Sequence, residues 1–93
     1  MIVSFRNKDL RLFWEKGNPQ FLPPDCVGRI EEILTRLDDA TSPHNMNIPG
    51  LRLHKLRGHK PPRWSVWVSA NYRITFSFDE NNNACKVDFE DYH

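Results

Sequence analysis

Hydrophobic residues recur with a helical period through the first 40 residues of the chain. The first such set follows the i, i+3, i+4 spacing of one helix face: Leu10, Phe13 and Trp14. Asn7 is a favourable N-cap and Gly17 a favourable C-cap. The pattern therefore predicts a helix over residues 8–16.

A second apolar face begins after Pro24, a residue that suits the first turn of a helix. Its positions are Val27, Ile30, Ile33, Leu34 and Leu37. We expect a helix over about 24–38, and we interpret both apolar faces as core-packing surfaces rather than ligand sites. The stretch 39–50 is rich in Ser, Asn and Pro without periodicity, which predicts a loop.

From Leu51 onward the apolar period changes to two, which is typical of strands. Four segments carry it: LRLHKLR, WSVWV, YRITFSF and CKVDFEDY. A short β-prone run at 2–6 predicts a further, first strand. No βαβ alternation is present, so hairpins and an antiparallel sheet are expected. The predicted class is α+β, a single domain over 1–93 with two N-terminal helices packed on one face of a small antiparallel sheet.

Residues paired across an antiparallel ladder point to the same side of the sheet, so the two faces can be assigned. A three-residue turn over 69–71 puts these side chains on the core face: Trp64, Val66, Val68, Tyr72, Ile74, Phe76, Phe78, Cys85, Val87 and Phe89. The predicted pairs are Ile74 with Phe89, Phe76 with Val87, and Arg73 with Glu90. The polar face then carries Arg52, His54, Arg73, Thr75, Ser77, Lys86, Asp88, Glu90 and Tyr92.

The charge is unevenly distributed along the chain. The net charge is +1, yet residues 40–78 hold six Lys or Arg and three of the four His, with no Asp or Glu. A local positive field of this kind attracts polyanions such as nucleic acid. The alternative interpretation is a solvated basic face that balances the acidic helices.

Composition excludes several other classes of protein. Hydrophobic residues make up 39% of the chain, enough for one packed core, and no apolar run approaches the roughly 20 residues of a membrane span. Arg6 interrupts the opening apolar segment before a signal peptide can form, so we expect a cytoplasmic protein without membrane contact. Cys26 and Cys85 lack metal-type spacing and are expected to be free, buried thiols. The histidine spacing likewise gives no metal motif, and no cofactor is expected.

The polar face and the chain end contain the groups needed to cleave RNA without a metal. They are the imidazoles of His54 and His93, the phenol of Tyr92, the carboxylate of Asp91, and the guanidinium groups of Arg57 and Arg73. Attack of a ribose 2′-hydroxyl on phosphorus needs a base, an acid and cations that stabilise the phosphate charge. From the residues alone, RNA cleavage remains one hypothesis for this surface.

Several motifs resemble the HigB branch of the RelE superfamily of type II toxins. They are the opening MIVSF, LDDAT at the end of the second helix, LHKLRG, WSVWVSANYRITFSF and the closing EDYH. The resemblance implies the RelE-like microbial ribonuclease architecture and a ribosome-dependent endoribonuclease that cuts mRNA in the A site and inhibits translation. It also implies a HigA-type antitoxin with a helix-turn-helix domain as partner.

The resemblance further implies a catalytic set, and a wider contact set is expected from the charge pattern. The catalytic residues implied are His54, Arg73, Asp91, Tyr92 and His93. In the preferred assignment Asp91 or His93 is the base and His54 is the acid or a charge stabiliser. Tyr92 orients or stacks on a base, and Arg73 binds the phosphate. Candidate contacts to mRNA and 16S rRNA of the ribosome are Arg52, Lys55, Arg57, Lys60 and Arg63.

One alternative function belongs to a different class. The chain would then be a weak or inactive relative that acts as a co-repressor, binding operator DNA only in complex with its antitoxin. A neighbouring gene that encodes a helix-turn-helix protein fits both interpretations.

Overall fold

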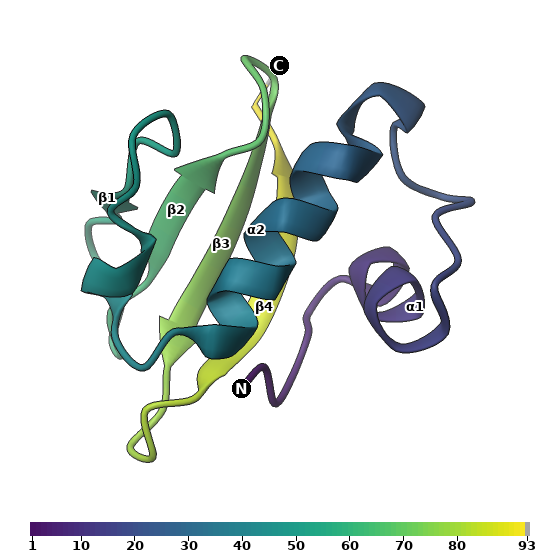
Figure 1. The fold of residues 1–93 in the computed structure, drawn as a ribbon. Coiled ribbons are helices and arrows are strands. Elements are labelled where there is room, and N and C mark those ends of the chain that lie inside the picture. Colours follow the sequence, from purple (N-terminus) through teal and green to yellow (C-terminus); the bar gives the residue numbers. More distant parts are fainter. Residues whose placement is uncertain (93) are drawn as a thin grey trace.

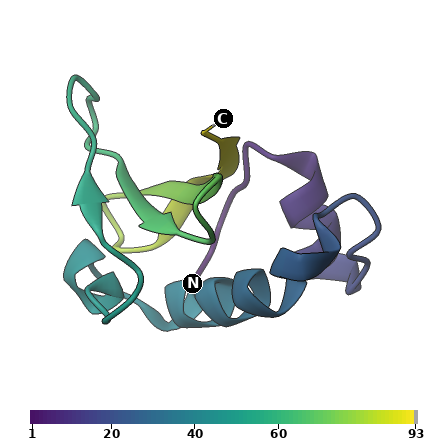
Figure 2. The same ribbon diagram turned by 90° about the horizontal axis from the view of Figure 1, so that it is seen from above.

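The computed structural model describes residues 1–92 and has an α+β architecture, as predicted (Figure 1). Its elements are α1 (Lys8–Lys16), η1 (Pro24–Cys26), α2 (Val27–Asp39), η2 (Pro43–Met46), β1 (His54–Lys55), β2 (Trp64–Trp67), β3 (Tyr72–Phe78) and β4 (Ala84–Asp91). The strands form one antiparallel sheet in the order β1-β2-β3-β4. Helix α2 crosses one face of this sheet, and α1 lies to the side, beyond β4 (Figures 1 and 2).

Helix α1 has the predicted bounds because both of its ends are capped locally. The side chain of Asn7 accepts hydrogen bonds from the backbone N–H groups of Asp9 and Leu10, both at 2.9 Å. Gly17 takes a left-handed conformation with φ 68° and donates its N–H to the Phe13 carbonyl. These interactions require only neighbouring residues, so the sequence is sufficient to predict them.

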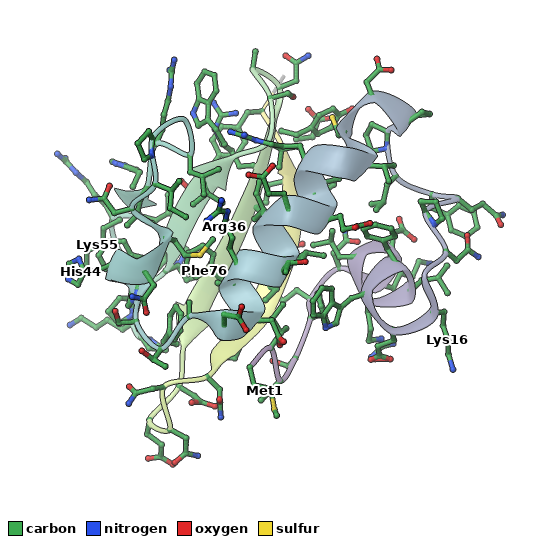
Figure 3. All side chains as sticks on the ribbon, in the orientation of Figure 1. Met1, Lys16, Arg36, His44, Lys55 and Phe76 are labelled. Atoms are coloured by element: carbon green, nitrogen blue, oxygen red, sulfur yellow. The ribbon has the colours of Figure 1, made fainter. Side chains whose placement is uncertain are left out.

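The second helix is confirmed, with one change at its start and another in the loop that follows it. Residues 24–26 form a 3₁₀ turn, and the α-helix proper begins at Val27. The predicted loop over 39–50 contains a second 3₁₀ turn, η2, because Met46 is anchored in the core. Four residues of the predicted face are fully buried: Ile30, Ile33, Leu34 and Leu37. They pack toward the sheet, where Phe76 is also fully buried (Figure 3).

The prediction of a strand at 2–6 is wrong. This segment makes only two isolated bridges to β4, Ile2 with Ala84 and Phe5 with Val87, and both are parallel. The left-handed conformation of Lys86, with φ 52°, distorts β4 between these two bridges. The segment nevertheless lies along the outer edge of β4 and covers hydrogen-bonding groups that an edge strand exposes.

The strand predicted in LRLHKLR is much shorter than the pattern indicated. Only His54 and Lys55 pair with β2, opposite Ser65 and Trp64 respectively. Arg52 interrupts the extended conformation with φ 50°, so the alternation does not extend through the segment.

The predicted pairing of β2 with β3 is confirmed, and that of β3 with β4 is confirmed for half of its length. Ile74 lies opposite Phe89 and Arg73 opposite Glu90. The register then shifts between Thr75 and Ser77, so the predicted pair of Phe76 with Val87 is not part of the ladder. A one-residue shift reverses the faces, because side chains alternate along a strand.

The register shift corrects the predicted position of Cys85. Ala84 is fully buried in its place, whereas Cys85 lies opposite Ser77 and is only partly buried. Burial, followed by the negative charge of Asp79, raises the pKa of the Cys85 thiol. Cys26 is buried as expected, and both thiols are free. A raised pKa disfavours the thiolate, which argues against a nucleophilic role for Cys85.

An arginine covers part of the sheet face opposite α2. Arg63 is only 4% exposed, and its guanidinium donates to Thr75 Oγ1 at 2.8 Å, the Lys86 carbonyl at 3.0 Å and Ser77 Oγ at 3.3 Å. Burial lowers the pKa of Arg63, and the nearby charge of Arg6 acts in the same direction. Thr75 and Ser77 are therefore buried rather than part of an open polar face.

Among residues 1–92, neither helix has the length and apolar character that a membrane span requires.

Arg63→Met is expected to lower the free energy of unfolding by about 2–3 kcal/mol, because the buried hydroxyls and carbonyl lose their charged donor. Urea unfolding followed by circular dichroism measures this change. Arg57→Met, at an exposed position, is the matched control and should change stability by less than about 0.5 kcal/mol. Equal stabilities for the two variants would contradict the structural role of Arg63.

Candidate active site

The open part of the face opposite α2 begins at β1 with His54. Its pairing with Ser65 puts the imidazole on the same side of the sheet as Ser65, as the alternation of side chains predicted. Ser65 in turn lies opposite Thr75, and Thr75 opposite Asp88, so one row of side chains crosses all four strands. His54 is exposed at the end of this row and is accessible to a substrate.

Arg73 is held at the start of β3 by the turn between β2 and β3. Its Nη1 donates to the carbonyl of Ser69 at 2.7 Å, that of Tyr72 at 3.0 Å and that of Ala70 at 3.3 Å. The guanidinium carbon also lies 4.9 Å from the ring centroid of Tyr92. Among the described residues, Nη1 is the only nitrogen of this side chain that forms hydrogen bonds, so the other nitrogens remain able to bind an anion.

Tyr92 reaches this face because the end of the chain runs beside the β2–β3 turn (Figure 1). Its backbone N–H donates to the carbonyl of Asn71 at 2.6 Å, which continues the pairing of β3 with β4 by one residue. The side chain is 47% exposed. The phenol thus stands beside the Arg73 guanidinium with much of its surface open to solvent.

The other residues of the expected set are arranged differently. Asp91 pairs with Tyr72, so strand alternation turns it toward the side of the sheet that α2 covers, away from Arg73. His93 lies outside the described residues. Glu90 is opposite Arg73 in the register, yet no ion pair joins the two side chains within residues 1–92. The pairing therefore puts His54, Arg73 and Tyr92 on the same face of the sheet, and of these only Arg73 and Tyr92 are in direct contact within residues 1–92.

The expected RNA and ribosome contacts fall into different environments. Arg57 and Lys60 are exposed on the loop between β1 and β2, which projects from the sheet (Figure 2). Lys55 points to the other side of β1, where its Nζ lies 5.9 Å from the centre of the Trp64 ring, on the same side of the molecule as His44 (Figure 3). Arg63 is buried, which argues against the expected contact role.

Sequence reasoning did not single out Trp67, although its ring contacts two arginines of this face. Trp67 pairs with Arg73 across the β2–β3 ladder and is half-buried on the same face. The guanidinium carbon of Arg73 lies 4.2 Å from the Trp67 ring centroid, and that of Arg52 lies 3.7 Å from it. The available signal was the alternation itself, which puts an unusually large apolar side chain on the polar face of β2.

This face is open rather than enclosed. Depressions among residues 1–92 lie along the helices and the N-terminal segment, and one of about 400 Å³ lies between α1 and Phe21. No three His, Cys, Asp or Glu side chains of the described chain form a group that would hold a metal ion. An open face with arginines, an imidazole and a phenol suits a large anionic substrate.

Comparison with known proteins agrees with the sequence motifs. The family of HigB-like toxins, described as RelE-like toxins of type II toxin-antitoxin systems, matches residues 3–93. The chain belongs to this family. It is also 42% identical to Endoribonuclease HigB of Proteus vulgaris over 93 residues, which cover the whole of both chains. The resemblance noted from the motifs is thus confirmed, and the two helices and four-stranded sheet are consistent with a HigB-like toxin.

Proposed function

We propose that this HigB-like toxin is an endoribonuclease that cleaves mRNA in the ribosomal A site and thereby inhibits translation. It acts in the cytoplasm, and a HigA-type helix-turn-helix antitoxin neutralises it. The observation that carries the proposal is the position of His54, Arg73 and Tyr92 on one exposed sheet face of a RelE-like toxin. The activity named for the Proteus relative supports the same chemistry.

The proposed reaction needs no group beyond those of the protein and the RNA. A base removes the proton of a ribose 2′-hydroxyl, and the 2′-oxygen forms a bond to the adjacent phosphorus. The bond from phosphorus to the 5′-oxygen breaks, and an acid protonates that oxygen. His54 is the proposed acid, since imidazole suits proton transfer near neutral pH. His93 is the proposed base, because strand alternation turns Asp91, the other expected candidate, away from Arg73.

Arg73 is the proposed ligand of the scissile phosphate. The turn carbonyls bind Nη1 and fix the orientation of the planar group, while the remaining N–H groups are available for phosphate oxygens. Tyr92, beside it, is the proposed stacking or orienting group for a base. Both side chains are held by backbone pairing at the chain end, which limits their movement relative to each other.

The proposed contacts with mRNA and 16S rRNA come from the cations around this face. Arg57 and Lys60 extend on the exposed β1–β2 loop, and Arg52 lies next to Arg73 across the Trp67 ring. Charged side chains of this kind contribute affinity for phosphate without sequence preference. In complex with the antitoxin, operator DNA is a further proposed ligand.

The first test is cleavage of a defined mRNA by the purified protein, with and without programmed 70S ribosomes. Cleavage is expected only on ribosomes. His54→Ala and His93→Ala should each lower its rate by about 10² to 10⁴, because each removes a proposed proton-transfer group. His59→Ala, which removes an exposed imidazole of the β1–β2 loop, is the matched control and should cleave like the wild type. A folded wild-type protein that cuts under neither condition would refute the proposal.

Arg73→Lys tests the need for a planar guanidinium. Lysine keeps the charge, but a single ammonium group is expected to bind the turn carbonyls and reach the phosphate poorly at the same time. The single-turnover rate on programmed ribosomes should fall by about tenfold or more, in line with the loss of one transition-state hydrogen bond. Wild-type cleavage by this variant would show that charge alone is sufficient at position 73.

A further inference from the structure

An indole lies between two arginines on the open sheet face. The guanidinium carbons of Arg52 and Arg73 lie 3.7 Å and 4.2 Å from the ring centroid of Trp67. They approach the ring from opposite sides of β2, because Arg73 lies opposite Trp67 on β3, whereas Arg52 follows Leu51, which pairs with Trp67 at the other edge of β2. Each therefore stacks on a different face of the indole, where the negative potential of the ring attracts a cation.

The backbone directs Arg52 onto this ring. Arg52 has φ 50°, a left-handed conformation that is uncommon for arginine. The N–H of Trp67 donates to the Leu51 carbonyl at 2.7 Å, which fastens the segment before Arg52 to β2. Backbone strain of this kind is found where surrounding contacts hold a functional side chain in place.

The stack brings together two like charges that repel each other. Within residues 1–92, Arg52 forms no hydrogen bond through its guanidinium, and Arg73 uses only Nη1. The two cations thus keep most of their N–H donors for a ligand. An anion that contacts both groups would relieve their repulsion, which makes the pair suited to a substrate with more than one negative charge.

The separation of the two groups indicates which anion they fit. Two stacking layers, each of about 3.5–4 Å, put the guanidinium groups roughly 7–8 Å apart. That distance is wider than one phosphate group and of the same order as the spacing of consecutive phosphates in an extended RNA strand. Because both faces of the indole are occupied, Trp67 is not available as a stacking platform for a base.

We propose that Trp67 is a positioning residue that holds Arg52 and Arg73 apart so that they bind two neighbouring phosphates of one RNA strand. The inference rests on the proposed function, in which Arg73 binds the scissile phosphate, and it assigns the adjacent phosphate to Arg52. Trp67 itself acts through the two arginines and touches neither the scissile bond nor the proton-transfer groups.

Single-turnover cleavage on programmed ribosomes tests the positioning role. Trp67→Leu should lower the rate at saturation about tenfold, since it removes both ring contacts, and should raise the ribosome concentration that gives half-saturation. Trp67→Phe keeps an aromatic ring and should stay within about threefold of the wild type. Trp14→Leu removes another half-buried indole, on α1, and is the matched control with wild-type cleavage. Arg52→Ala combined with Trp67→Leu should cost less than the product of the two single effects.

A second measurement does not depend on catalysis. Binding of a fluorescent 2′-O-methyl RNA oligonucleotide, which cannot supply the attacking hydroxyl, is followed by anisotropy at increasing salt. Loss of one phosphate contact should reduce the slope of log affinity against log salt by about 0.7 in Trp67→Leu and in Arg52→Ala. Thermal unfolding checks that the variants are folded, and Trp67→Met replaces Trp67→Leu if the latter is not.

The two measurements separate the possible failures. If the wild type does not cleave on ribosomes, the proposed function fails, and the salt slope still decides the role of Trp67. A folded Trp67→Leu variant with wild-type cleavage and a wild-type slope would overturn the proposal. The proposal would also be overturned if the wild-type protein does not bind the oligonucleotide at low salt, or if Trp67→Phe is as defective as Trp67→Leu.

Discussion

Strand β3 is hydrogen-bonded on both sides, to β2 and to β4, and its alternation decides the role of most other residues. Ile74 and Phe76 point toward α2 and are fully buried, so they cannot be moved without loss of the core. Arg73 and Thr75 must then point the other way. The burial of apolar side chains under α2 therefore also determines which polar side chains are available for chemistry on the opposite face.

That opposite face is divided into two parts with different physical roles. Arg63 fills one part, where a buried charge satisfies the hydroxyls of Thr75 and Ser77 and is itself satisfied by them. The other part stays open, and there Trp67 and the turn carbonyls hold Arg73 in one orientation. Rigid support of this kind fixes the direction of the Arg73 guanidinium on an exposed face.

The alternation of side chains along the strands predicted much of the candidate site. It put His54, Arg73 and Tyr92 on one face, and the pairing found in the sheet agrees. Their catalytic roles could not be predicted in the same way, since alternation gives the direction of a side chain and not its chemistry. These roles are proposals that rest on the family. The alternation failed locally at the register shift after Thr75, where Ala84 rather than Cys85 is buried, and Arg63, expected at the surface, is buried as well.

The sequence by itself determined features that depend on neighbouring residues or on simple alternation. Helix α1 between Asn7 and Gly17 is one example, and the pairing of Ile74 with Phe89 is another. Tertiary structure decided the features that need residues far apart in the chain: the burial of Arg63 against β3, the register shift near Lys86, and the stacking of Arg52 and Arg73 on Trp67. The physical reason is that each depends on the close approach of side chains whose contacts no local pattern records.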